Sequence, residues 1–101
     1  MNLRQAKRPV AIFAFKRPST TELVMDEIRR YAPPTLFLVQ DGPRSGAGDE
    51  EGVEQVRKTL EAIDWPCEVH KIYAGRNLGL QKRFSTALSE IFDQVDECII
   101  L

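Results

Sequence analysis

The chain alternates short apolar runs with longer stretches in which apolar residues recur at helical spacing. The apolar runs cover Val10–Phe15, Thr35–Gln40, Cys67–Ala74 and Glu97–Leu101. Each run is too short for a typical helix, and the runs are rich in β-branched and aromatic residues, which favours strands. The third run alternates apolar and polar residues, as a strand near a sheet edge does. The fourth has the sequence of a central strand.

Three segments between these runs carry an apolar stripe typical of amphipathic helices. The stripes consist of Leu23, Val24, Ile28 and Tyr31, then Val53, Val56, Leu60 and Ile63, then Leu80, Phe84, Ala87, Leu88, Ile91 and Val95. We expect Pro33-Pro34 to end the first helix and Asp64-Trp65-Pro66 to end the second.

Polar residues suited to capping stand before each stripe. Ser19 with Glu22 three positions later matches a capping box. Asp49 is placed to cap the second helix, and Asn77 is a good N-cap for the third.

The predicted order is β-α-β-α-β-α-β, which indicates a parallel sheet with right-handed crossovers. We therefore expect an α/β protein with a Rossmann-like three-layer α/β/α fold and a mainly parallel four-stranded sheet. The 101 residues favour one domain, which we place at 9–101 after an N-terminal extension at 1–8. Because the chain stops inside a predicted buried strand, we expect it to be the N-terminal piece of a longer protein.

The net charge of −1 says little, but the distribution of charge says more. Residues 1–21 contain several Lys and Arg and no Asp or Glu, and the same is true of residues 69–89. Cys67 and Cys98 lack metal-ligand spacing, so we interpret them as reduced thiols. With no apolar run of membrane-spanning length and no signal-peptide pattern, we expect a cytoplasmic protein.

Polar and glycine residues follow each of the first three predicted strands. They are Lys16-Arg17, Asp41-Gly42 and the stretch 75–79, "GRNLG". Ligands of open parallel sheets bind outside the carboxyl ends of the strands, so these three loops are the candidate site. The sequence shows no Ser/His/Asp or Cys/His set suited to nucleophilic catalysis.

The third loop combines glycines with cations at the start of a helix. Free N–H groups at a helix start attract anions, and Arg76, Lys82 and Arg83 would add positive charge there. A bound phosphate would explain this arrangement. An Asn-capped helix with solvated cations on its outer face would explain it as well. The stretch is neither GxGxxG nor a Walker loop.

The other two loops also allow two interpretations each. Lys16 and Arg17 could contact a phosphate or a base, or they could be a solvated strand end. Asp41 could accept a hydrogen bond from a base or ribose, or it could belong to a plain Asp-Gly turn.

Taken together, "VAIFAFKRP", "LFLVQDG" and "GRNLGLQKRFSTALSEIFDQVDECIIL" resemble the nucleotide-binding half of a GT-A glycosyltransferase. The similarity spans about residues 9–101 and is nearest to the N-acetylglucosaminyltransferase I-like and family 2-like branches. In that family an apolar strand like 97–101 runs into an acidic metal motif.

The resemblance implies a nucleotide-diphosphate sugar as ligand and a divalent cation, Mn or Mg, in the full-length parent. It implies no nucleic-acid partner and no cation bound by this part alone. Arg17 and Asp41 would contact the base or ribose, and the remaining residues would line the pocket or lie near the diphosphate. The full set of implied binding residues is Phe15, Lys16, Arg17, Asp41, Arg76, Asn77, Gly79 and Lys82.

The chain departs from the family where the acidic motif would begin, after Leu101. We therefore expect the parent to be a glycosyltransferase and this chain to be inactive alone, with no catalytic residue and no metal ligand of its own. We also expect self-association through the exposed last strand. A stand-alone α/β nucleotide-binding or regulatory module is the alternative. A nucleotidyltransferase is disfavoured because "AFKRPST" lacks the glycine-rich loop of that class.

Overall fold

The computed structural model describes residues 7–101, so residues 1–6 of the proposed N-terminal extension lie outside the described part. It confirms the predicted order of elements and the α/β class. The elements are β1 Val10–Ala14, α1 Pro18–Tyr31, β2 Thr35–Gln40, α2 Glu50–Leu60, β3 Glu68–Tyr73, α3 Leu80–Phe92 and β4 Ile99–Ile100.

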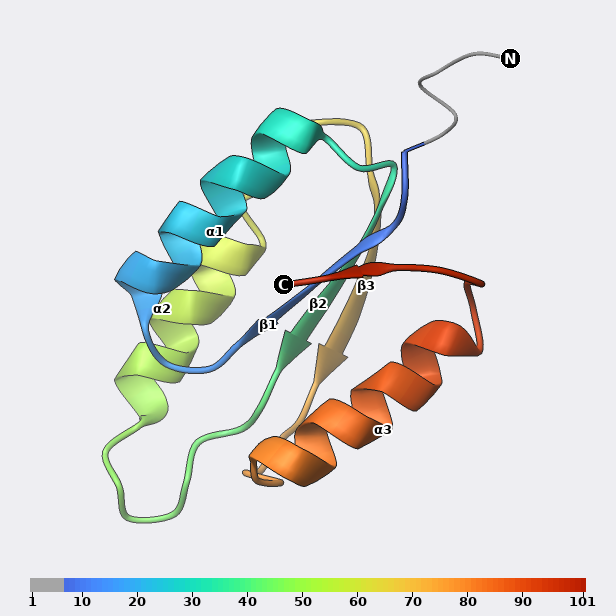
Figure 1. Ribbon diagram of the computed structural model, residues 1–101. Coiled ribbons are helices and arrows are strands. Elements are labelled where there is room, and N and C mark those ends of the chain that lie inside the picture. The colour runs from blue at the N-terminus through green and yellow to red at the C-terminus, as the bar shows by residue number, and fades with distance from the viewer. Residues whose placement is uncertain (1–6) are drawn as a thin grey trace.

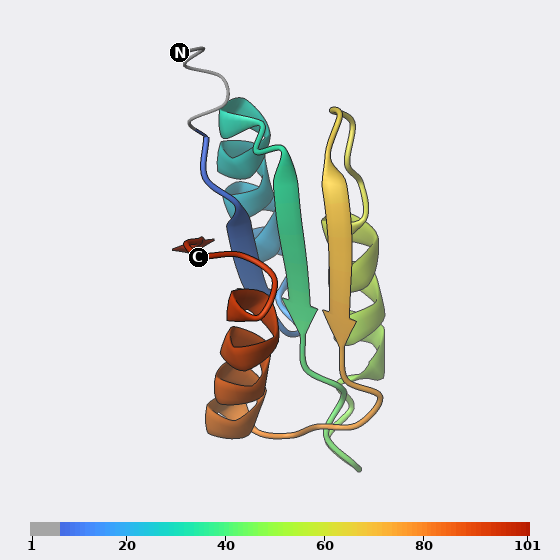
Figure 2. The same cartoon turned by 90° about the vertical axis from the view of Figure 1, so that its right-hand side faces the viewer.

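The four strands form one sheet in the order β3-β2-β1-β4, and every pair is parallel. Helices α1 and α2 lie together on one face, while α3 lies on the other (Figure 1, and at a right angle in Figure 2). The fold is therefore a Rossmann-like three-layer arrangement, as the sequence predicted. All strands point their carboxyl ends toward the same edge of the sheet.

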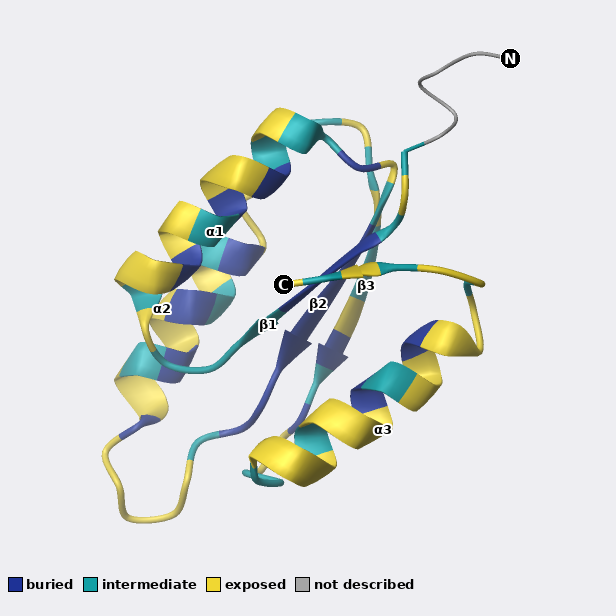
Figure 3. Cartoon of the chain, in the orientation of Figure 1, coloured by how far each residue is buried: buried dark blue, intermediate teal, exposed yellow. Residues whose placement is uncertain are grey.

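The alternation of side chains along each strand produces two separate cores. Ile12 and Leu38 face α1 and α2, whereas Ala11 and Phe37 face α3. The core under α1 and α2 comprises Val10, Ile12, Met25, Ile28, Leu36, Leu38, Val56 and Leu60. Figure 3 shows β1 and β2 mostly in dark blue between helices whose dark blue residues face the sheet, whereas β3 and β4 are largely teal and yellow.

The predicted capping box of α1 is wrong. The helix begins at Pro18 with Arg17 at the N-cap, so Ser19 lies inside the helix, and the N-cap makes no side-chain hydrogen bond. The fixed φ of proline suits the first helical position and sets the start earlier than the serine. Instead, the Thr21 hydroxyl donates to the Arg17 carbonyl at 2.9 Å.

The apolar stripes of α1 and α3 are also only partly correct. In α1 the residues that are buried are Thr21, Met25 and Ile28, and Leu23 is 69% exposed. In α3, Ala87 and Ile91 are buried, but Leu80 is 87% exposed because the first turn of α3 projects beyond the sheet. Both helices are amphipathic, as their periodicity predicted. The residues that they bury against the sheet are only partly those of the predicted stripes.

The last strand differs from the prediction in position. β4 was expected to be a central strand, yet among the described residues it pairs only with β1, through Val10↔Ile99 and Ala11↔Ile100. β3 lies at the opposite edge, as its alternating pattern predicted. Helix α2 ends at Leu60, before the predicted stop at Asp64.

Candidate binding cleft

The loops after β1, β2 and β3 meet at the carboxyl edge of the sheet, beside the first turns of α3. They enclose a cleft of about 410 Å³. Four of the residues predicted from sequence line it, one or more from each loop: Phe15, Asp41, Asn77 and Gly79. The structure therefore brings together half of the predicted set.

The remaining walls of the cleft combine aromatic rings with guanidinium groups. Phe13 and Phe84 lie with their ring centroids 4.9 Å apart, and Phe84 is 41% exposed. Arg44 and Arg83 line the same cleft. The arrangement offers flat apolar surfaces next to positive charge, which suits a planar ring carrying an anionic group.

Asp41 is the central connection between the second and third loops. Its Oδ1 accepts hydrogen bonds from the Gly42 and Leu78 backbone N–H groups, both at 2.8 Å. Its Oδ2 accepts from the Gly79 N–H and from the Asn77 Nδ2, both at 3.1 Å. An ionised carboxylate has about four acceptor sites, so protein donors occupy all of them.

Asn77 does not cap α3, which corrects the expected Asn-capped helix. Gly79 is the N-cap, with φ +86°, and no side chain caps this end. The Asn77 amide is used elsewhere, because its Nδ2 donates to Asp41 and, at 2.9 Å, to the Gly42 carbonyl. Asn77 therefore connects the third loop to the second loop instead of capping α3.

The second and third loops touch backbone to backbone. A Cβ atom placed on Gly42 would lie 2.5 Å from the carbonyl carbon of Arg76. Only glycine permits this approach, so Asp41-Gly42 is more than a generic turn. The pair holds the loop that opens α3 in place.

The other four predicted residues lie away from the cleft. Lys16 lines a neighbouring hollow together with Arg17, near the end of β1. Lys82 lies on the outer side of α3, and Arg76 is exposed in the third loop. The cations predicted to surround one ligand therefore do not gather in this cleft.

Lys16 is instead part of a charge cluster around the buried Asp49. Its Nζ lies 3.0 Å from Asp49 Oδ1. Arg44 reaches the same carboxylate through Nε at 2.8 Å and through its backbone N–H at 3.1 Å. The Asp49 side chain is 1% exposed. Asp49 stands at the predicted N-cap of α2 but makes no capping hydrogen bond, because its oxygens are committed to these cations.

The hydrogen bonds from the Arg44 side chain hold the pKa of Asp49 well below its usual range. Burial of the carboxylate acts in the opposite direction, and the hydrogen bond from Lys16 adds to the lowering. Asp49 is therefore ionised at neutral pH, and it ties the ends of β1 and the loop after β2 to α2.

Neither arginine that lines the cleft belongs to the set implied by the resemblance. Arg44 lies in the "RSGAGDEEG" loop, where nothing in the local pattern distinguishes it. Arg83 stands among the cations noted at the start of the third helix. Its Nε is buried without a hydrogen-bond partner, and only its Nη2 reaches Thr86 Oγ1, at 3.3 Å.

The fold and this cleft define the class of the molecule as an α/β protein with a candidate ligand site at the carboxyl edge of a parallel sheet. No family model matches the chain, and neither the curated proteins nor the solved structures contain a match. Among residues 7–101, no helix is long and apolar enough to cross a membrane. Within the same range, no group of three or more His, Cys, Asp or Glu could hold a metal ion.

Proposed function

We propose that the chain is the donor-binding part of a glycosyltransferase of the GT-A class, and that the cleft holds the nucleotide of a nucleotide-diphosphate sugar. The observation that carries the proposal is the pairing of the aromatic wall with Arg83. The rings of Phe13 and Phe84 line the same cleft as the guanidinium of Arg83, whose buried Nε lacks a hydrogen-bond partner among the described residues. A base would stack on the wall and a phosphate oxygen would accept from Arg83.

Asp41 has a supporting role in this proposal. A base could reach the carboxylate only by displacing one of its four protein donors. We therefore propose that Asp41 shapes the cleft by holding Leu78 and Gly79, and that the base is recognised by other groups. This changes the role that the resemblance implied for Asp41.

A divalent cation does not fit the described residues, because they offer no cluster of metal ligands. In this proposal the described residues bind and orient the donor. The groups that activate the acceptor hydroxyl are supplied by the rest of the parent protein.

The test is an NMR titration of the ¹⁵N-labelled chain with uridine and guanosine diphosphates and with their sugar derivatives. Saturable shifts of the Phe15, Asn77 and Arg83 signals are expected. Arg83→Gln should weaken binding about tenfold, the loss of one charge-assisted contact. Arg30→Gln removes the same charge from the distant, exposed Arg30–Glu27 pair and should leave the affinity unchanged.

Two results would overturn the proposal. One is the absence of saturable shifts with every nucleotide. The other is equal affinity of the wild type and the Arg83→Gln variant, with shifts centred outside the cleft. The Arg30→Gln control separates a specific contact from a general effect of net charge.

We also propose a cytoplasmic location, supported by the unpaired Cys67 and Cys98, and self-association through β4. Ile99 and Leu101 are 39% and 50% exposed at the sheet edge, and an unpaired edge is a template for another strand. Sedimentation should show mass rising with concentration, and Ile99→Lys should return the chain to a monomer. A wild-type monomer at high concentration contradicts this part of the proposal.

A further inference from the structure

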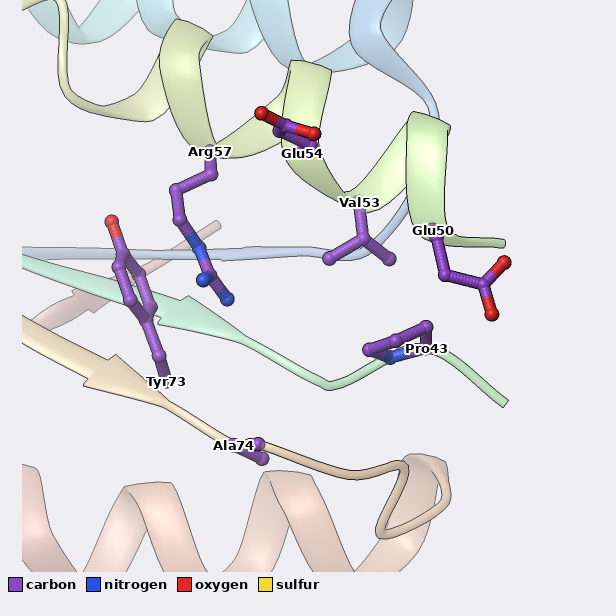
Figure 4. Close-up of a pocket in the computed structure, with 8 residues that line it drawn as sticks. Pro43, Glu50, Val53, Glu54, Arg57, Tyr73 and Ala74 are labelled. Carbon is purple, nitrogen blue, oxygen red and sulfur yellow. The ribbon is translucent and has the colours of Figure 1, made fainter. Parts of the chain in front are cut away.

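A second hollow lies at the same edge of the sheet but on the opposite face, between α2 and the end of β3. Its volume is about 580 Å³. Figure 4 shows Arg57 and Val53 pointing down from α2 toward this space, with Tyr73 and Ala74 below and Pro43 at one side. None of the residues implied by the family resemblance lines it.

The Arg57 side chain is held in one orientation. Its Nε donates to Gln40 Oε1 at 2.9 Å, and its Cζ lies 4.3 Å from the centre of the Tyr73 ring. Gln40 is fully buried. The Gln40 Nε2 donates to the carbonyls of Phe15 and Val53 at 3.0 and 2.7 Å, which turns the amide oxygen toward Arg57. The guanidinium is thus stacked and anchored before any ligand arrives.

The charge of Arg57 is not neutralised by an ion pair within the described residues 7–101. Glu54 and Glu61 stand three and four positions away on or just after the same helix, a spacing at which pairs commonly form. Glu61 is engaged elsewhere, since it accepts from the Tyr73 hydroxyl at 2.8 Å and pairs with Lys71 at 3.4 Å. A guanidinium has five N–H donors, and only the Nε–H has a partner here.

From this geometry we propose that the hollow is a binding site for a small organic oxyanion, a carboxylate or phosphate carried on an apolar body. The terminal N–H groups of Arg57 would grip two oxygens of the anionic group side by side. Val53, Pro43 and Ala74 provide the apolar wall for the rest of the ligand. Because Gln40 and Tyr73 already fix the arginine, little side-chain entropy is lost on binding.

Two acidic residues of the hollow add a selectivity. Glu50 and Glu54 also line it, and in Figure 4 the Glu50 carboxylate points away from Arg57. A ligand with negative charge at both ends would be repelled there, so the site favours a molecule with one anionic end. This site is separate from the cleft beside α3, and the inference does not depend on the proposed function.

The experiment is an NMR titration of the full chain that follows the Arg57 Nε–H signal and the backbone amides of Val53, Ala74 and Gly75. The probes are phenyl phosphate, benzoate and inorganic phosphate, each at constant ionic strength set with sodium chloride. Saturable shifts are expected, with phenyl phosphate binding at least several-fold more tightly than inorganic phosphate. The comparison of phenyl phosphate with benzoate tells which anionic group the site prefers.

Variants separate the specific contact from charge alone. Arg57→Gln should lower the affinity about tenfold or more, and Arg57→Lys should recover only part of it because a lysine lacks the planar fork. Lys58→Gln removes the same charge from the neighbouring, exposed position and should bind as the wild type does. If the wild-type signals do not saturate with any probe, or if Arg57→Gln binds equally well, the site is not an anion site.

Discussion

Two buried aspartates at the same edge of the sheet are held in opposite ways. Asp41 is 7% exposed and Asp49 is 2% exposed. Asp41 receives only neutral donors, three backbone N–H groups and one side-chain amide. Asp49 receives the Lys16 ammonium and the Arg44 guanidinium, together with one backbone N–H.

The difference shows two solutions to one problem, the burial of a carboxylate. Directed neutral donors fix the path of a loop, because each bond requires one position of the backbone. Cations neutralise the charge but leave their own long side chains partly in water, since Lys16 and Arg44 remain 35% and 51% exposed. The stability contributed by the Asp41 contacts should respond to substitutions that change the shape of the loops. The stability contributed by the Asp49 contacts should respond to pH and salt.

The largest effect is expected when Asp41 is replaced. Asp41→Asn places an NH₂ group against backbone N–H donors, so buried donors lose their acceptor. The free energy of unfolding should fall by about 3 kcal/mol, measured by urea denaturation. The amides of Leu78 and Gly79 should also exchange faster with solvent. Asp93→Asn, at the exposed end of α3, is the matched control, and equal stability of both variants would refute the role of Asp41.

Next in size is the contact between the two loops that Asp41 joins. Gly42→Ala would bring a Cβ to 2.5 Å from the Arg76 backbone, and the resulting strain should lower stability by about 2 kcal/mol. Gly75→Ala is the control, because a Cβ there meets nothing within 4 Å. Thermal or urea unfolding of the pair gives the difference directly. An unchanged Gly42→Ala variant would mean that the loops do not touch in this way.

The contribution of Asp49 to the stability of the fold should depend on pH. Its pKa in the folded chain is held below the ordinary value of about 4, so its contribution to stability is fully present above about pH 4 and is lost as pH falls through the folded pKa. The gap in urea midpoint between wild type and Asp49→Asn should be widest at neutral pH. It should narrow below about pH 4. A gap that stays constant down to strong acid would contradict the ion cluster.

The smallest effect is expected for Lys16, one of two cations on Asp49. Lys16→Met should shift the urea midpoint less than Asp49→Asn, because Arg44 still neutralises the carboxylate. Raising the salt concentration to 1 M should reduce the shift further, since the lysine is partly exposed. The same salt should leave the effect of Asp41→Asn nearly unchanged, and a similar salt response in both would remove the contrast between them.

The parts of the fold that could be predicted are those set by local pattern. Residues Thr35–Gln40 form β2 with the predicted bounds, because a run of apolar β-formers between turn residues has few other solutions. The parallel order of strands follows from the intervening helices. The edge position of β3 was readable from its alternation.

The contacts of the candidate site that could not be predicted join residues far apart in the sequence. Asn77 looks like a helix cap until Asp41 and Gly42, more than thirty positions earlier, are seen to take its amide. Lys16 looks like a ligand contact until Asp49 is placed beside it, 33 positions on. Nothing in the sequence around Arg57 indicates a binding site, because the orientation of its side chain depends on Gln40 and Tyr73, which lie in two different strands.

The placement of β4 has a consequence for how the chain folds. Its pairing with β1 joins Val10 to Ile99, which closes a loop of almost the whole chain. Three further backbone hydrogen bonds of 2.8 to 3.0 Å between the same two segments stabilise the closed loop. Contacts of such long sequence separation form late, after the local units that bring their ends together. We therefore expect the β1-α1-β2-α2-β3 unit to assemble first and the α3-β4 arm, which carries Arg83, to join it last.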